Sequence, residues 1–356
     1  MEDEIYNNLS GFKPEKVLVT GASGFIGGHI TRCLVEQGVN VSCLARKGSD
    51  LRFISHLPVE IIVGDITEKD SLNASFKGMD AIIHSAGKVS DWGCYESFYH
   101  ANVEGTHNVL QAALDNSIKR VIITGSVSSY GEENYHGLKD ESFPYNSHYP
   151  YFLDRILPSG MNHYRDTKAI STRESVDFAH KHGLNLIVLE PVWVYGENEF
   201  SSGFYEYVKS VKSGAFLMPG NHSNTFPVIY AGDLARAYWL ALTSHLEGVQ
   251  RIVLGNPSTE KMNRIYQLFC KEAGLRKPFL LPKCITYPIG FVLELIYSTF
   301  RAKKPPLLTR ARVNMFYDSI GFDISKATQL LQFGNLVPLE DGIKRTVQWY
   351  RDNNFL

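Results

Sequence analysis

Short apolar runs alternate with stretches of helical periodicity along much of the chain. Runs of this kind form strands that are buried on both faces, because helices cover each side of a parallel sheet. The strand-like runs lie at residues 16–20, 39–44, 59–65, 80–87, 119–126, 184–191 and 251–256. The helix-like stretches lie at residues 25–37, 102–116 and 163–183. The pattern therefore predicts βαβ units and an α/β fold with a doubly wound parallel sheet of the Rossmann type.

Three segments interrupt this alternation. Residues 132–160 are rich in proline, glycine, histidine and aromatic residues, which predicts a long excursion and a candidate lid. Residues 197–227 and 257–356 lack the strand–helix repeat. We expect these last two segments to form a smaller, mostly C-terminal substrate lobe. The expected sheet domain comprises residues 16–196 and 228–256, and residues 1–15 are expected to form a leader.

The charge of the chain excludes one class of partner. The 356 residues include 36 Lys and Arg against 37 Asp and Glu, so the net charge of −1 provides no basic footprint for nucleic acid.

The five cysteines are scattered and form no CxxC pair, which favours a reducing, cytoplasmic setting. We expect no metal site.

One apolar segment invites a membrane interpretation. Residues 284–300 are followed by three basic residues, but a spanning helix needs about 20 apolar residues, and Pro288 and Glu294 interrupt the run. We expect that this segment does not span a bilayer. A core helix, a wall of the substrate pocket and a peripheral membrane contact through residues 284–304 are alternatives, and a homodimer is also open.

A glycine triplet follows the first predicted strand. Gly21, Gly24 and Gly27 lie between that strand and the next predicted helix. Glycines at this spacing allow a tight turn, close approach of a pyrophosphate and close packing of the helix on the sheet. The N-terminus of the helix then presents free N–H groups to the phosphates. The sequence therefore predicts a dinucleotide cofactor.

The ends of the next two strands bear on which dinucleotide binds. Arg46 follows the second strand, where an acidic residue would bind the ribose 2′-hydroxyl. A guanidinium suits a 2′-phosphate, so NADP(H) is favoured, and NAD(H) stays open if Arg46 only stacks on the adenine. Asp65 ends the third strand, and we expect it either to contact the adenine amino group or to close a plain turn.

Three side chains are suited to hydride-transfer chemistry. Tyr164 and Lys168 lie four residues apart, on one face of a predicted helix, and Ser126 ends a strand at the edge where ligands bind. A ketone or alcohol that exchanges hydride needs a proton donor or acceptor at its oxygen. We expect the Lys168 ammonium and an oxidised nicotinamide ring to lower the pKa of Tyr164 from its usual value of about 10.

Eight motifs resemble those of the extended short-chain dehydrogenase/reductases. They are TGASGFIG, GDIT, HSAG, NVEGTHNVL, SVSSYG, YRDTK, PVWVYG and VIYAGDLARA, and they cover most of residues 16–256 in the family's order. The resemblance implies that Ser126, Tyr164 and Lys168 form the catalytic set and that Asn102 lies in the region supporting the site. It also implies a set of cofactor-binding residues. These are Gly21, Ser23, Gly24, Phe25, Ile26, Gly27, Arg46, Asp65, Ile66, Ser85, Ala86, Gly87, Asn102, Tyr164, Lys168 and Pro191.

The match to the family also has departures. Ser126 stands five residues before Gly131, as the family's catalytic serine does before its glycine, whereas Ser128 and Ser129 are near alternatives. HSAG stands where the family often has HxAA. The separation of Ser126 from Tyr164 is longer than usual, which concerns the size of the substrate more than the chemistry.

Two aromatic residues bear on the class of substrate. Nucleotide-sugar enzymes of the family typically carry Asn at the position of Trp193. They usually carry Arg seven residues before the aspartate that corresponds to Asp233, and this chain has Phe226 at that position. A diphosphate would meet apolar surface there, which is costly for a charged group.

The C-terminal part, including residues 282–333 and PLEDGIKRTVQWY, resembles the 3β-hydroxysteroid dehydrogenase branch and its bacterial ketoreductase relatives.

These observations predict an NAD(P)(H)-dependent oxidoreductase that interconverts a hydroxyl and a ketone. The expected partner is a small apolar substrate, such as a sterol, a long-chain β-keto acid or a flavonoid-like ketone. A nucleotide-sugar epimerase or dehydratase is the main alternative, and a non-catalytic cofactor-sensing protein is a third.

Overall fold

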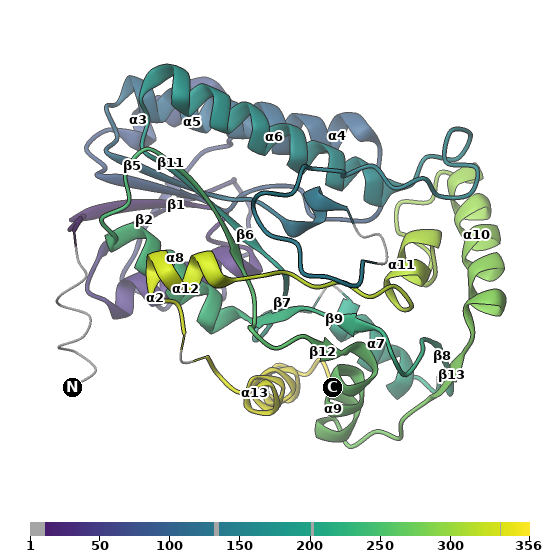
Figure 1. Ribbon diagram of the computed structural model, residues 1–356. Coiled ribbons are helices and arrows are strands. Elements are labelled where there is room, and N and C mark those ends of the chain that lie inside the picture. Colours follow the sequence, from purple (N-terminus) through teal and green to yellow (C-terminus); the bar gives the residue numbers. More distant parts are fainter. Residues whose placement is uncertain (1–10, 132–134, 201–202, 335) are drawn as a thin grey trace.

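A seven-stranded parallel sheet forms the centre of the molecule (Figure 1). The computed structural model describes residues 11–131, 135–200, 203–334 and 336–356. The strands follow the order β3-β2-β1-β4-β5-β6-β11. Their bounds are β1 Lys16–Thr20, β2 Asn40–Ala45, β3 Glu60–Val63, β4 Ala81–His84, β5 Arg120–Thr124, β6 Leu186–Pro191 and β11 Val249–Leu254. The strand order reverses at β1 and β4, so the predicted doubly wound α/β fold is confirmed.

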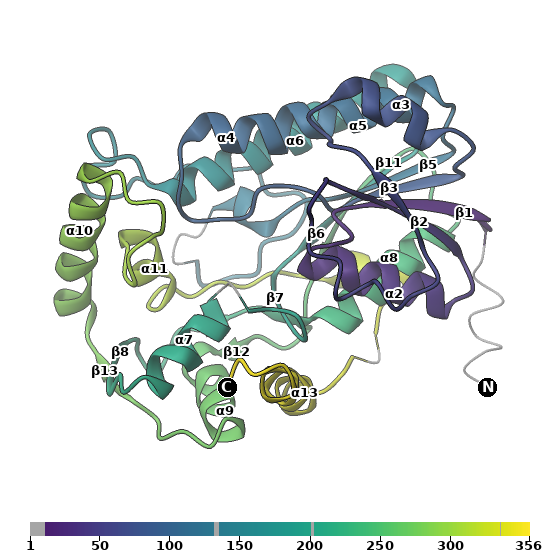
Figure 2. The ribbon, with the colours of Figure 1, turned by 180° about the vertical axis from the view of Figure 1, so that it is seen from behind.

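Helices cover both faces of this sheet. Figures 1 and 2 show α3, α4, α5 and α6 on one face, and α2 and α8 on the other. The short α12 packs against α8 and β11. The bounds are α2 Phe25–Glu36, α3 Lys69–Phe76, α4 Tyr95–Tyr99, α5 Gly105–Asp115, α6 Gly160–His182, α8 Ala231–Thr243 and α12 Ser325–Leu331. A π-helical turn, His100–Glu104, joins α4 to α5.

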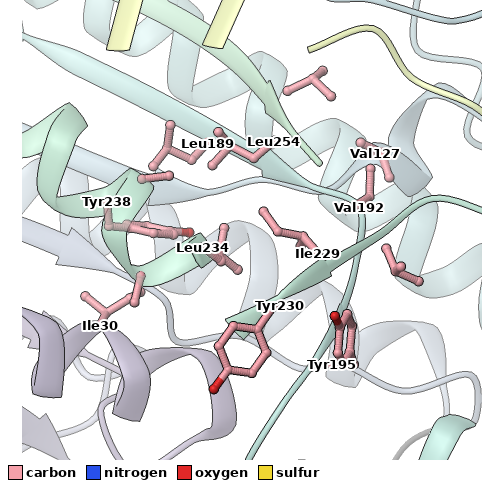
Figure 3. Close-up of a cluster of buried hydrophobic side chains, with 14 of the residues drawn as sticks. Ile30, Val127, Leu189, Val192, Tyr195, Ile229, Tyr230, Leu234, Tyr238 and Leu254 are labelled. Atoms are coloured by element: carbon pink, nitrogen blue, oxygen red, sulfur yellow. The ribbon is translucent and has the colours of Figure 1, made fainter. Parts of the chain in front are cut away.

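Alternate residues of each strand enter two different hydrophobic cores. Val17 and Val19 of β1 belong to the core beneath α2 and α8, whereas Leu18 belongs to the core beneath α5. Figure 3 shows part of the first core, in which Ile30 of α2 and Leu189 of β6 lie among the buried side chains. Burial on both sides explains why these strands read as continuous apolar runs.

The remaining elements form three two-stranded pairs and five helices among the described residues. The pairs are β7 with β10, β9 with β12 and β8 with β13. Their bounds are β7 Trp193–Tyr195, β8 Leu217–Pro219, β9 Thr225–Phe226, β10 Val228–Tyr230, β12 Glu260–Lys261 and β13 Phe279–Leu281. The helices are α7 Gly203–Lys212, α9 Met262–Glu272, α10 Lys283–Thr299, α11 Arg310–Met315 and α13 Leu339–Asp352. In both views α10 stands at the edge of the molecule, away from the sheet (Figures 1 and 2).

The aromatic-rich excursion has little regular structure where it is described. It forms a bridge between Lys139 and Phe322, and otherwise turns and irregular chain lead to α6. Residues 132–134, which begin the predicted lid, lie outside the described residues. The excursion is held down at Tyr145, whose hydroxyl donates to Glu190 of β6, and at Phe152, whose carbonyl accepts from Arg310 of α11.

The described part of the chain shows neither a membrane-spanning helix nor a cluster of metal-ligating side chains. No helix there has the length and hydropathy needed to cross a bilayer. Within the same residues, no group of three or more His, Cys, Asp or Glu side chains is placed to hold a metal ion.

Candidate active site

The carboxyl ends of the central strands meet at one edge of the sheet. Thr20, the last residue of β1, lies opposite Leu44 of β2 and His84 of β4. The loops that follow β1, β2, β4 and β5 therefore leave the sheet side by side. These loops carry most of the residues that the sequence predicts for the cofactor.

The glycine loop fits a bound pyrophosphate. Gly21 adopts a φ of +74°, and a Cβ atom there would lie 2.6 Å from the backbone nitrogen of Ala86. A Cβ atom on Gly27 would lie 2.1 Å from the carbonyl oxygen of Gly21. Gly24 is the N-cap of α2, so no side chain caps the helix and its first N–H groups can serve an anion. Ser23 lies in this turn, and Phe25 and Ile26 are the first two residues of α2.

The loops after β2 and β3 place the two residues expected near the adenosine. Arg46 directly follows β2, and its side chain is exposed. Asp65 follows β3, and its Oδ1 accepts hydrogen bonds from the backbone and hydroxyl of Thr67 at 2.9 and 2.8 Å. One carboxylate oxygen of Asp65 thus closes a turn, as in the plainer of the two interpretations. The neighbouring Ile66 is buried, and its carbonyl accepts from Asn108 at 3.0 Å.

Asn102 joins the loop after β4 to α6, the helix that carries Tyr164. Ser85, Ala86 and Gly87 form that loop, and a Cβ atom on Gly87 would lie 3.0 Å from Asn102 Oδ1. The buried Asn102 side chain accepts from the backbone N–H of Lys88 at 2.7 Å. Its Nδ2 donates to Thr167 Oγ1 of α6 at 3.2 Å. Asn102 therefore links this loop to α6, and its role in supporting the site stays a prediction.

A buried histidine beneath this loop was not singled out from the sequence. His84 Nδ1 lies 2.7 Å from Thr20 Oγ1, and its Nε2 lies 3.0 Å from Thr106 Oγ1. Burial, reinforced by the positive charge of Lys168, lowers the pKa of His84 to about 3. A neutral imidazole therefore braces β1, β4 and α5. Its position in HSAG was the only sequence signal for it.

Ser126 lies close enough to Tyr164 to influence the pKa of its phenol. Ser126 follows β5 and caps a 3-10 turn, Val127–Tyr130, by accepting from the backbone N–H of Ser128 at 3.2 Å. Burial raises the pKa of Tyr164, and the Ser126 hydroxyl opposes that rise. Ser128 and Ser129 are also buried, neither contributes to the pKa of Tyr164, and the Ser129 hydroxyl has no hydrogen-bond partner among the described residues. This proximity favours Ser126 among the three serines.

Lys168 lies one helical turn beyond Tyr164. Its Nζ donates to the carbonyl oxygen of Thr124 at 2.5 Å. Burial lowers the pKa of Lys168 to about 8, and the carboxylate of Glu190 opposes this shift. The polypeptide by itself thus raises the pKa of Tyr164. The lowering expected from Lys168 together with the positive charge of an oxidised nicotinamide stays a prediction.

Glu190 is the most conspicuous charged group that sequence reasoning missed. It lies on β6, next to Pro191, and its side chain is fully buried. Tyr130 donates to Glu190 Oε2 at 2.7 Å, and Tyr145 donates to Oε1. Arg251 of β11 lies 3.5 Å from the same carboxylate, and its guanidinium covers the Tyr145 ring at 4.3 Å. Burial raises the pKa of Glu190, whereas Arg251 lowers it.

The two aromatic residues expected in the substrate region touch each other. The ring centroids of Trp193 and Phe226 lie 4.5 Å apart. Phe226 is buried beneath Trp193, which is only partly covered. In the excursion, Tyr151 is buried and accepts a hydrogen bond from Arg165 at 2.9 Å. Tyr145 and Tyr151 are thus tied to buried polar partners, and the role of the excursion as a lid remains a prediction.

Comparison with known proteins finds relatives over nearly the whole chain. The 2-alkyl-3-oxoalkanoate reductase of Shewanella oneidensis is 26% identical over 346 residues, which are 94% of this chain and 86% of the relative. A putative UDP-glucose 4-epimerase of Methanocaldococcus jannaschii is 28% identical over 348 residues, 95% of this chain and 99% of the relative. The 3beta-hydroxysteroid-dehydrogenase/decarboxylase isoform 1 of Arabidopsis thaliana is 26% identical over 356 residues, 93% of this chain and 78% of the relative.

A solved structure repeats the fold described above. The crystal structure of gox2253 matches with a TM-score of 0.77 and 24% identity, over 96% of this chain and 99% of the other. A profile of the NAD dependent epimerase/dehydratase family matches residues 17–255, which hold the sheet, the glycine loop and the Ser126, Tyr164 and Lys168 side chains. The chain belongs to the NAD dependent epimerase/dehydratase family.

Proposed function

We propose that this family member is a reductase, or in reverse a dehydrogenase, that interconverts a ketone and a hydroxyl on an apolar substrate. The observation that supports the proposal is the Trp193–Phe226 contact. These aromatic side chains occupy the positions at which nucleotide-sugar enzymes carry polar ligands. A buried diphosphate would lack partners there, whereas an alkyl or ring substrate gains from contact with the rings. A long-chain β-keto acid or a sterol fits this description.

The proposed chemistry assigns a role to each of three side chains. The nicotinamide supplies the hydride when it is bound. In the direction of reduction, the Tyr164 hydroxyl gives its proton to the substrate oxygen, and the Ser126 hydroxyl holds that oxygen by a hydrogen bond. The Lys168 ammonium acts on Tyr164 through its charge and binds the nicotinamide ribose. NADP(H) is the preferred cofactor. Arg46 is exposed directly after β2, and the next two residues, Lys47 and Gly48, bring no negative charge that would repel a 2′-phosphate.

A chain-length series tests the proposal directly. Purified protein with NADPH is given β-keto acids of increasing length, and oxidation of the cofactor is followed by its absorbance. Each added CH₂ contributes up to about 0.8 kcal/mol of binding, which lowers KM about fourfold until the pocket is filled. The Tyr164→Phe variant should bind NADPH with unchanged Kd and lose about 10²–10⁴-fold in turnover.

The epimerase alternative makes the opposite prediction. One relative is named a putative UDP-glucose 4-epimerase, so UDP-glucose belongs in the same assay. An epimerase converts its substrate without net change in cofactor absorbance. Conversion of UDP-glucose without net change in cofactor absorbance, with no trend in KM along the keto-acid series, would make a nucleotide sugar the substrate in place of an apolar ketone. A Tyr164→Phe variant that kept more than a tenth of the turnover would remove the role given to Tyr164.

A further inference from the structure

Helix α10 has its polar and apolar faces reversed relative to an ordinary surface helix. Glu294, the only acidic residue of the helix, is 2% exposed and faces the protein. It forms a buried ion pair with Arg310 of α11, with Glu294 Oε2 2.9 Å from Arg310 Nε and Oε1 3.0 Å from Nη2. A surface helix normally turns its apolar stripe inward and its charges to water. The charge of α10 points inward instead.

The opposite side of α10, its outer face, is apolar. The large apolar side chains exposed there are each between 36% and 48% exposed, so they form a broad face rather than isolated contacts. They are Ile285, Ile289, Val292, Leu295, Ile296 and Tyr297. Lys283, at the first turn, is only partly exposed and pairs with Asp318 at 3.1 Å. No exposed residue from Cys284 to Thr299 carries a charge.

The aromatic-rich excursion extends this apolar surface. Phe152 packs against Phe291 of α10, with ring centroids 5.3 Å apart, and its backbone N–H lies 3.4 Å from the Tyr287 hydroxyl. Phe152 and its neighbour Leu153 remain 58% and 45% exposed, and Ile156 is 80% exposed. Phe300, just beyond the C-terminus of α10, is also 80% exposed. Exposed apolar clusters of this kind mark interaction sites.

Basic residues flank α10 on both sides in the sequence. Residues 276–304 include six Lys and Arg and one acidic residue, the buried Glu294. Arg301, Lys303 and Lys304 are exposed after Phe300, and Arg276 and Lys277 are exposed before β13. Arg155 is exposed between Leu153 and Ile156, and adds to the same rim. The rim is therefore positive around an uncharged centre.

This charge pattern distinguishes between two occupants. A second copy that paired α10 with α10 in antiparallel fashion would bring the basic residues of one end against those of the other. Like charges that face each other in this way oppose association. A bilayer with anionic lipids offers an apolar interior for the centre and negative headgroups for the rim. The pattern thus matches a lipid surface and conflicts with a symmetric dimer.

We propose that the outer face of α10, together with Phe152, Ile156 and Phe300, binds the protein to the surface of an anionic membrane. The helix lies in the plane of the interface with its apolar side chains among the upper acyl chains, and the basic rim contacts the headgroups. Because no described helix can cross a bilayer, the contact is peripheral. The inference does not depend on the proposed reaction, since it uses none of the residues of the candidate active site.

Binding to vesicles of defined composition tests the proposal. The full chain is sedimented with vesicles of phosphatidylcholine alone and with vesicles containing phosphatidylserine, at low and high salt. We expect binding to the anionic vesicles that weakens with salt, because the rim acts by charge. Each basic residue near a charged bilayer contributes about 1 kcal/mol, or about fivefold in affinity. The triple variant Arg301→Gln, Lys303→Gln, Lys304→Gln should bind on the order of 100-fold more weakly.

A second triple variant tests the apolar centre. Ile289→Ser, Val292→Ser and Ile296→Ser replace exposed side chains, so the thermal midpoint should stay near that of the wild type while vesicle binding falls at least tenfold. The matched control replaces three exposed apolar residues elsewhere, as Val63→Ser, Leu138→Ser and Leu330→Ser, which are 67%, 52% and 39% exposed. This control should bind vesicles as the wild type does.

Three outcomes would overturn the proposal. The first is no binding of the wild type to anionic vesicles. The second is equal loss of binding in the control and in the α10 variant. The third is a wild-type dimer that the α10 variant converts to a monomer, with no affinity for vesicles, since a second copy would then cover the face.

Discussion

We expect Arg46 to set the choice between the two dinucleotides in the proposed site. The Arg46→Asp variant removes a guanidinium from the 2′-phosphate and adds a carboxylate that suits a 2′-hydroxyl. A hydrogen bond to a charged group contributes about 1.5–3 kcal/mol, so the NADPH to NADH affinity ratio should fall about 10- to 100-fold. Dissociation constants of both cofactors measure this. The neighbouring Lys47→Asp makes the same charge change, and an equal effect there would assign the preference to general charge.

Glu190 controls the charge of Lys168 in the free site. Burial holds the pKa of Lys168 at about 8, and the carboxylate of Glu190 raises it against that trend. The ammonium is present below its pKa, so kcat/KM for ketone reduction should be highest below about pH 8 and fall above it. In Glu190→Gln the opposing charge is gone, so we expect the fall to occur at lower pH.

The pH profile separates this effect from a merely structural one. Glu190→Gln keeps the size of the side chain, and its amide oxygen can still accept from one of the two tyrosines, Tyr130 and Tyr145, while its amide nitrogen donates to the hydroxyl oxygen of the other. The control Tyr145→Phe removes one of these hydrogen bonds and leaves the charge in place. If kcat/KM falls equally at every pH in both variants, Glu190 only holds the aromatic-rich excursion in place and does not act on the pKa of Lys168.

The candidate residues were predictable from the sequence where a local motif carries them. Ser126, Tyr164, Lys168 and the glycines stand in short stretches whose spacing has a direct meaning on a strand end or helix face. The partners of the Glu190 side chain lie 45 or more residues away in the chain, so no local sequence pattern predicts that this carboxylate belongs to the site. The rise that burial gives the pKa of Tyr164 was not predicted, because the sequence does not reveal how deeply the phenol is buried.

At the scale of elements, the buried pair between α10 and α11 holds the periphery of the molecule together. Arg310 is fully buried, and it also donates to the carbonyl oxygens of Phe152 and Leu157. Removing one partner leaves an uncompensated buried charge, which costs about 3–5 kcal/mol. We expect Glu294→Gln to lower the free energy of unfolding by that order, as measured by urea denaturation.

A double variant tests whether the cost comes from the unpaired charge. Glu294→Gln combined with Arg310→Met removes both charges, so it should destabilise the protein less than the sum of the two single changes. Simple additivity would show that Arg310 acts through the carbonyls of the excursion and independently of Glu294.

The elements of the sheet were predictable and those of the second lobe were less so. The strands are buried on both faces, so they appear as apolar runs whatever their neighbours are. The same reasoning left three alternatives open for residues 284–300, because an apolar helix in a core and one with an apolar outer face have similar composition. The alternative of a core helix is wrong, since only Thr286, Gly290 and Glu294 of α10 are buried. The division into two domains stays a prediction.

At the scale of the whole molecule, buried histidines make stability depend on acidity. Burial lowers the pKa of His84 to about 3 and that of His29 to about 4, from 6.5. Folding excludes these protons, so the stabilisation is complete above pH 6.5 and is lost as the pH falls toward 4 and 3. Each histidine then contributes a slope of about 1.4 kcal/mol per pH unit below 6.5.

Urea denaturation between pH 7.5 and 5 measures this dependence. His84→Gln keeps a side chain that can bond to Thr20 and Thr106 and cannot take up a proton, so about half of the slope should disappear. His29→Gln provides an independent check. Slopes equal to that of the wild type in both variants would assign the acid sensitivity to carboxylates.

The place of β11 at the edge of the sheet governs how the nascent chain completes its fold. β6 pairs with β11 in parallel, and the two are separated by α7, α8 and the small strands. A ribosome adds about 5–20 residues per second, so several seconds pass between the synthesis of Pro191 and that of Val249. During this interval an apolar strand edge is open to other chains. Efficient production of this protein therefore calls for chaperone protection late in translation, and a chain that stops before Val249 should aggregate.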